Sequence, residues 1–181
     1  MSSTESEWCE ERDVIYFSVT SDGSTGEDWI KRLESNDFRF GDYAKQVLRS
    51  PDFKPTNGVT TEVVVLKGML FEDNDRITKK IRSEAYAGTF TQGRKLFDPN
   101  AEVACLIREK FTDEEIEAMG LVWLVVMHDP INDSGGVPDL LSANRYGYGH
   151  WLYACRGRPE RRWVRDYGFA FAVVSQISSQ D

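Results

Sequence analysis

LVWLVVM, from Leu121 to Met127, decides the fold of this 181-residue chain. The run carries no charge, is rich in Val and is closed by His128-Asp129-Pro130. A run this short and this β-branched predicts a strand that is buried on both faces. Because burying one large aliphatic side chain is worth roughly 1.5–3 kcal/mol, this strand can anchor a core. We expect that core to contain Trp123, Val125, Leu106, Ile107 and Phe171.

Helix signals dominate before the central run, and strand signals follow it. Ser24–Glu27 and Thr112–Glu115 both have the spacing of a helix-capping box. Three strand-like segments come after the run, near residues 139–146, 150–155 and 168–175. Their connections are too short for helical crossovers, so these strands should pair antiparallel. The sequence therefore predicts an α+β fold, with an antiparallel sheet formed largely by the C-terminal half and packed by helices from the N-terminal half.

The chain reads as one domain behind a short tail. Residues 1–12 are acidic and carry no apolar period, which predicts a disordered acidic tail. No internal repeat or long linker divides residues 13–181, so we expect a single α+β domain there. Hydrophobic residues make up 40% of the chain, which is enough for a core without disulfide or metal support.

Several classes of protein are disfavoured by absent patterns. No run approaches 18 apolar residues, and the N-terminus lacks the features of a signal peptide, so we expect a soluble cytoplasmic protein with no membrane partner. Cys9, Cys105 and Cys155 are far apart and form no CxxC pair, which predicts reduced thiols and no metal site. No nucleotide-binding glycine motif is present, so no cofactor is expected. The sequence assigns no oligomeric state.

Charge is distributed unevenly along the chain. The net charge is -8, and residues 1–120 hold 16 Lys and Arg against 24 Asp and Glu. Residues 121–181 hold six of each kind, and their six basic residues are all arginines, between Arg145 and Arg165. Glu160 alone opposes them within that window. This uneven charge gives information about binding partners and not about the fold.

The connection after the second C-terminal strand is the strongest candidate for a binding site. Arginine beside exposed aromatic rings is typical of protein hot spots and of sites for single-stranded nucleic acid. We therefore predict a small binding or accessory protein whose loop contacts an acidic protein or a nucleic acid. The overall acidity favours a protein partner or a short strand over broad DNA binding. The expected binding residues are Arg156, Arg158, Arg161, Arg162 and Trp163.

Two other functions stay open. His128 and Asp129 follow the central strand, so an enzyme, such as a hydrolase, could carry them at the mouth of a pocket. Adjacent residues on a strand point to opposite faces, however, so they are poorly placed to act as a base and its orienting carboxylate. The third function is an interaction module that uses the acidic helical half.

Overall fold

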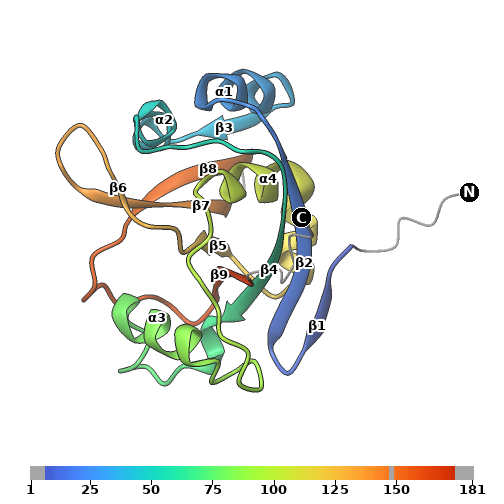
Figure 1. Ribbon diagram of the computed structural model, residues 1–181, viewed down its shortest axis with the longest axis vertical. Helices are drawn as coiled ribbons and strands as arrows, with labels where there is room; N and C mark the ends of the chain where they lie inside the picture. Colours follow the sequence, from blue (N-terminus) through green and yellow to red (C-terminus); the bar gives the residue numbers. More distant parts are fainter. Residues whose placement is uncertain (1–6, 147–148, 174–181) are drawn as a thin grey trace, which may run out of the picture.

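The computed structural model describes residues 7–146 and 149–173 of the chain (Figure 1). Within them, one nine-stranded sheet has the order β1-β2-β4-β9-β5-β7-β8-β3, and β6 pairs with β7. The strands are β1 (Cys9–Glu11), β2 (Val14–Asp22), β3 (Phe38–Phe40), β4 (Asn57–Lys67), β5 (Trp123–Val126), β6 (Ile131–Asn132), β7 (Pro138–Tyr146), β8 (Gly149–Arg156) and β9 (Tyr167–Val173). The helices are α1 (Gly26–Ser35), α2 (Asp42–Arg49), α3 (Thr78–Ala87), α4 (Glu102–Lys110) and α5 (Asp113–Ala118), with a 3-10 turn at Gly68–Leu70.

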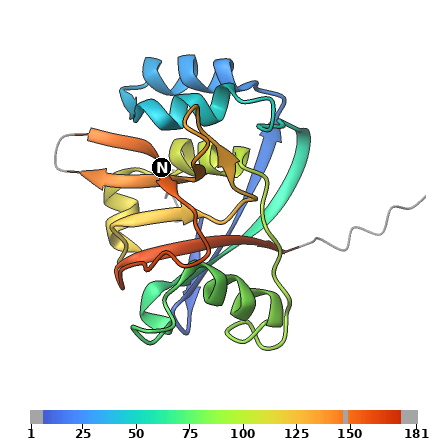
Figure 2. The same cartoon turned by 90° about the vertical axis from the view of Figure 1, so that its left-hand side faces the viewer.

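The mixed α and β content and the mainly antiparallel sheet are confirmed. β7 and β8 form the expected antiparallel hairpin, which projects from the body of the molecule (Figure 2). Two parallel pairs, β5 with β9 and β3 with β8, were not expected. The sheet draws on both halves of the chain, since β1 to β4 end by Lys67 and β5 begins at Trp123. Pairing between such distant segments leaves no local pattern in the sequence.

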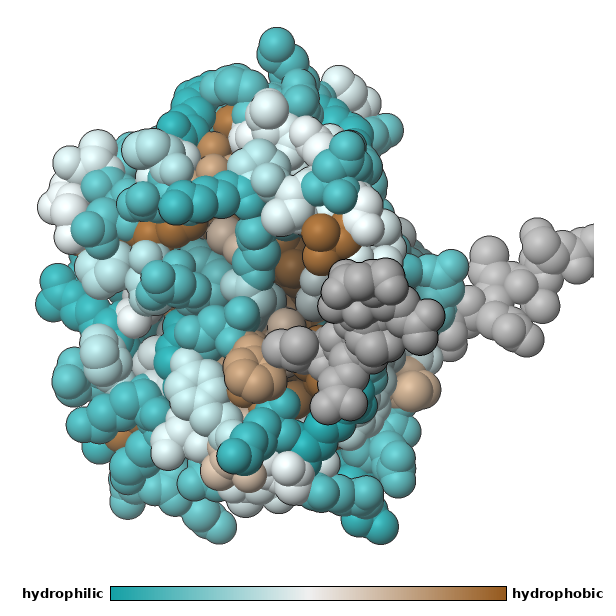
Figure 3. Space-filling view, in the orientation of Figure 1, coloured by the Kyte–Doolittle hydropathy of each residue, from teal (hydrophilic) through white to brown (hydrophobic). Residues whose placement is uncertain are grey.

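The sheet carries a core cluster on each face. One cluster includes Trp29 of α1, Val47 of α2 and Ile107 of α4. The other includes Ile81 of α3 and Phe169 of β9. In Figure 1, α1 and α2 lie at one end of the sheet and α3 at the other. The face of the molecule in Figure 3 is mainly hydrophilic, with separate apolar areas.

The central strand serves both clusters, as its sequence predicts. Leu124 and Val126 belong to one cluster and Val125 and Met127 to the other, and all four are fully buried. Trp123 differs from the expectation, because its ring is only half-buried. It is the first residue of the strand, at the margin of the second cluster.

The other residues expected in the core divide similarly. Ile107 and Phe171 are fully buried. Leu106 is only partly buried and packs at the margin of the first cluster.

Two helices, α1 and α5, begin at side-chain caps that the sequence indicated. Thr112 and Glu115 form the expected capping box at α5. At α1 the cap lies one residue later than the expected Ser24. The Thr25 hydroxyl accepts from the backbone amide of Asp28, and the Asp28 carboxylate accepts from the backbone amide of Thr25. Either register satisfies the amides that a helix start leaves without partners.

Residues 9–11, within the predicted acidic tail, form a strand. Cys9–Glu11 forms β1, which pairs antiparallel with β2 through a turn at Arg12 and Asp13. Both turn residues have positive φ, 53° and 64°, as a two-residue hairpin turn requires. Residues 1–6 of the predicted tail lie outside the described residues, as do 147–148 in the β7–β8 turn and 174–175 of the predicted last strand. In the described ranges, no helix is long and apolar enough to cross a membrane.

Candidate functional site

A cavity of about 680 Å³ lies beside β8 and the connection that follows it. This volume is in the range of ligand-binding cavities, roughly 300–1,000 Å³. The structure brings three of the four predicted arginines together at this cavity. Its lining residues are Trp123, Tyr153, Ala154, Cys155, Arg156, Arg158, Glu160 and Arg161. We call this the β8 cavity.

Cys155 of β8 forms part of the apolar lining of the β8 cavity. Cys155 lies against Ser142 of the neighbouring strand, with 3.1 Å between Sγ and Oγ, and Ser142 donates to Oδ1 of Asn144 at 2.7 Å. Burial raises the pKa of the Cys155 thiol, so the group stays protonated near neutral pH. Cys155 therefore fits an apolar floor better than a nucleophile.

Two aromatic rings flank that floor. Trp123 stacks on Tyr167 with ring centroids 4.5 Å apart and 15° between the planes. Tyr153 lies beside Trp151, with centroids 5.2 Å apart. Trp123 and Tyr153 are both half-buried and both line the β8 cavity. Rings held by their neighbours offer apolar area with little entropy left to lose on binding.

The three arginines of the β8 cavity are not equivalent. Arg161 donates to the carbonyl oxygen of Arg156 at 2.9 Å, and its guanidinium lies 3.9 Å from the centroid of the Trp163 ring. These contacts fix Arg161 in place. Arg156 and Arg158 are exposed, and Glu160 is the acidic lining residue. The rim therefore carries three positive groups against one negative group.

The remaining two predicted binding residues lie elsewhere. Arg162 is exposed and does not line the cavity. Trp163 is only 4% exposed, and its Nε1 donates to Oγ1 of Thr78 at 2.8 Å. It packs against Phe169, with ring centroids 5.6 Å apart. Trp163 thus fastens the connection to α3 and the core, because its indole finds both an apolar site and a buried acceptor there.

His128 and Asp129 meet through the backbone carbonyl of Asp129. His128 is 1% exposed, its Nδ1 donates to the carbonyl oxygen of Asp129 at 2.7 Å, and its Nε2 accepts from the amide of Leu141 at 2.9 Å. Burial lowers the pKa of His128 to about 4, so the ring is neutral near pH 7. Asp129 is exposed, and neither residue lines the β8 cavity. The imidazole joins the end of β5 to β7, with both nitrogens occupied.

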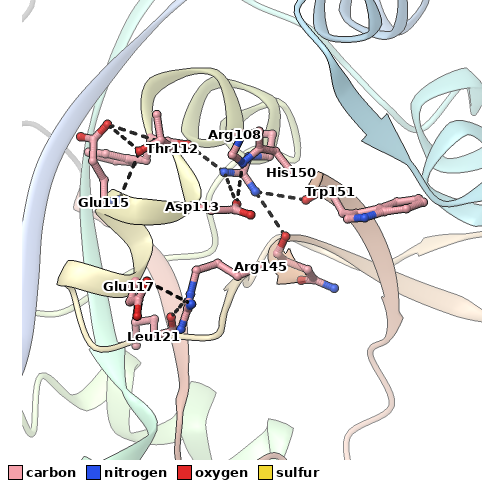
Figure 4. A network of polar contacts seen from close by, with 11 residues as sticks. Arg108, Thr112, Asp113, Glu115, Glu117, Leu121, Arg145, His150 and Trp151 are labelled. Atoms are coloured by element: carbon pink, nitrogen blue, oxygen red, sulfur yellow. Dashed lines mark hydrogen bonds and ion pairs between the residues drawn. The ribbon is translucent and has the colours of Figure 1, made fainter. Parts of the chain in front are cut away.

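Sequence reasoning missed a buried ionic network beside the β7–β8 pairing, near the turn end of the hairpin (Figure 4). Arg108 is fully buried, donates to the carbonyl oxygen of Phe111 at 2.8 Å and pairs with Asp113 at 3.1 Å. The same Asp113 oxygen lies 3.0 Å from Nδ1 of His150. Burial lowers the pKa of Arg108, and Asp113 opposes that change. A basic residue near a helix end usually faces solvent, so nothing in the sequence marked this one.

A second missed group is the carboxyl of Asp139, which lies directly opposite Arg156 in the β7–β8 pairing. Asp139 is 3% exposed. Burial, reinforced by a hydrogen bond with Asp133, raises the pKa of Asp139 to about 7. That hydrogen bond lowers the pKa of Asp133, so the two carboxyls share a proton near neutral pH. The sequence could have indicated this buried carboxyl, because Asp139 falls within the strand predicted near residues 139–146.

No protein family, curated protein or solved structure matches this chain. In residues 7–146 and 149–173, no three His, Cys, Asp or Glu side chains gather as they would around a metal ion.

Proposed function

We propose that this protein is a binding protein that holds an acidic segment of a partner protein in the β8 cavity. The observation that carries the proposal is the convergence of Arg156, Arg158 and Arg161 on a cavity with aromatic sides. Planar guanidinium groups suit carboxylates, which they bind through two parallel hydrogen bonds. An apolar side chain of the segment would rest on Cys155 between Trp123 and Tyr153.

Each part of the rim has a distinct task in this proposal. Arg161 is preorganised by its contacts to Arg156 and Trp163, so little entropy is lost when it meets a carboxylate. Arg158 is exposed and accessible to an incoming segment. Binding of an anion also relieves the repulsion among three neighbouring positive charges.

Charge favours a protein segment over a nucleic acid. The net charge of -8 repels a polyphosphate, which brings one charge per nucleotide, more than a short peptide with two or three carboxylates. Glu160 on the rim would face the continuous row of phosphates. A peptide can place a neutral or basic residue at that position instead.

The test uses two charge-reversal variants of the same connection. A fluorescently labelled peptide of alternating Glu and Val is titrated with the wild-type protein, with Arg158→Glu and with Arg162→Glu. We expect Arg158→Glu to weaken binding about tenfold, as for loss of one charged hydrogen bond. Arg162→Glu is the matched control, since Arg162 is also exposed but lies outside the cavity lining. Both variants should unfold at nearly the wild-type temperature.

Three results would refute the proposal. The first is equal loss of affinity in both variants, which indicates a general charge effect. The second is undiminished binding in Arg158→Glu. The third is an oligothymidylate of the same length that binds more tightly than the acidic peptide, which would assign the site to single-stranded nucleic acid.

A further inference from the structure

We infer that the acidic segment binds as an additional strand on the outer edge of β8, with its backbone paired to Ala154. This inference rests on the proposed function and specifies how the partner is held. Strand addition is a common mode of peptide recognition, in which backbone hydrogen bonds supply affinity and side-chain pockets supply specificity.

The outer edge of β8 is only partly covered. β7 pairs with the inner edge along the whole of β8. On the outer edge, β3 pairs only with His150, Trp151 and Leu152. The amide of Gly41 then donates to the carbonyl oxygen of Leu152 at 3.0 Å, and the chain turns away into α2. Among the residues that the structure describes, no strand pairs with this edge beyond Leu152.

Hydrogen bonds on either side of Ala154 show which way its backbone faces. In an antiparallel ladder, the amide and carbonyl of one residue face the same side, and successive residues alternate. The Leu152 carbonyl faces outward, since it accepts from Gly41, and the Arg156 carbonyl faces outward, since it accepts from Arg161. The Gly157 amide faces inward, donating to Pro138 of β7 at 2.8 Å. Ala154 therefore directs its amide and its carbonyl to the open edge.

The cavity and the edge coincide at this residue. Ala154 is half-buried and is itself one of the lining residues of the β8 cavity. A strand placed along the edge would alternate its side chains between the two faces of the sheet. Those on the face of Cys155 would meet Tyr153 of the adjacent strand, and a carboxylate at the strand end would meet Arg158 or Arg161.

The same arginines indicate why the occupant is acidic and is not a second copy of this chain. Exposed strand edges invite pairing between identical molecules, and charged side chains beside an edge prevent it. Two copies meeting edge to edge here would bring Arg156, Arg158 and Arg161 of each into proximity. An acidic segment converts that repulsion into attraction, so the charges that exclude self-pairing select the partner.

The experiment separates backbone pairing from side-chain docking. The peptide of alternating Glu and Val is synthesised with a single N-methyl group, moved one residue at a time through its centre. Only alternate amides of an added strand face β8. We therefore expect N-methylation to weaken binding about three- to tenfold at every second position, as for loss of one backbone hydrogen bond. The positions between them should bind like the unmodified peptide.

The free protein offers a second measurement that needs no ligand. By amide hydrogen exchange followed with NMR, the Ala154 amide should exchange much faster than the Cys155 amide, which faces β7. Saturating peptide should slow exchange at Ala154. Slow exchange at Ala154 in the free protein, or N-methyl effects without the two-residue period, would overturn strand addition. If Arg158→Glu still weakens binding in that case, the acidic-segment proposal stands while this inference fails.

Discussion

Replacing Asp139 with Asn should remove a specific part of the pH dependence of stability. The Asp139 carboxyl is buried against Asp133, and its pKa is raised to about 7 from an ordinary value of 3.8. Between these two pH values the folded protein holds a proton that the unfolded chain has released. The stabilisation from this proton is complete below about pH 4 and is lost as the pH rises to about 7.

The size of the effect follows from the pKa. At about 1.36 kcal/mol for each pKa unit, the loss has an upper limit of about 4 kcal/mol. Arg156 lies opposite and favours the ionised carboxylate, and the turn at Asp133 can relax toward water. We therefore expect a loss of about 2 kcal/mol between pH 4.5 and pH 8. The side-chain amide of the Asp139→Asn variant resembles the protonated acid, so its hydrogen bond to Asp133 does not titrate.

The assay is urea unfolding of the wild-type protein and of Asp139→Asn at several pH values. A comparison is needed because His128 acts in the opposite direction. Its pKa is lowered to about 4 from 6.5, so its contribution to stability increases as the pH rises through that window. Subtracting the variant cancels His128, which is present in both proteins. A difference in unfolding free energy that stays constant within about 0.5 kcal/mol would refute a shared proton between Asp133 and Asp139.

Two further predictions concern the connection after β8 and the thiols. Trp163→Ala should cost about 3–5 kcal/mol in urea melts because the indole is buried and hydrogen-bonded, whereas Arg162→Ala should change stability by less than about 0.5 kcal/mol; equal costs would contradict the assigned positions. Cys9 is exposed and Cys105 is buried, and burial raises the Cys105 pKa. Iodoacetamide should therefore label Cys9 in the native protein and Cys105 only after unfolding, as mass spectrometry would show; similar rates for both would contradict the burial of Cys105.

The part of the fold set by neighbouring residues could be predicted from the sequence. The central strand followed from its own apolar run, and the cap at Thr112 followed from a spacing of three residues. The parallel pairing of β5 with β9 could not be predicted, since the paired residues Trp123 and Tyr167 are separated by the whole β7–β8 hairpin. Side chains decide helix caps locally, whereas strand order depends on packing of the entire sheet.

The candidate site shows the same division. Arg156 and Arg158 could be singled out because they lie at the end of β8 and in the short, basic connection after it, and both line the β8 cavity. The burial of Trp163 could not be predicted, because its acceptor, Thr78, is supplied by a distant helix. The open edge at Ala154 depends on where β3 stops pairing, which no pattern within β8 records. The arginine-rich composition identified the connection as a candidate site. Which of its residues line the cavity depends on tertiary structure.

The position of β9 determines when this chain can complete its fold during synthesis. In the sheet of the described residues, β9 alone joins the ribbon β1-β2-β4 to the ribbon β5-β7-β8-β3. Until Tyr167–Val173 has left the ribosome, β4 and β5 each lack a central neighbour and expose apolar edges. At about 5–20 residues synthesised per second, the nascent protein spends several seconds as two incomplete ribbons. Within the described sheet, the pairing of the two ribbons therefore waits until β9 has been made.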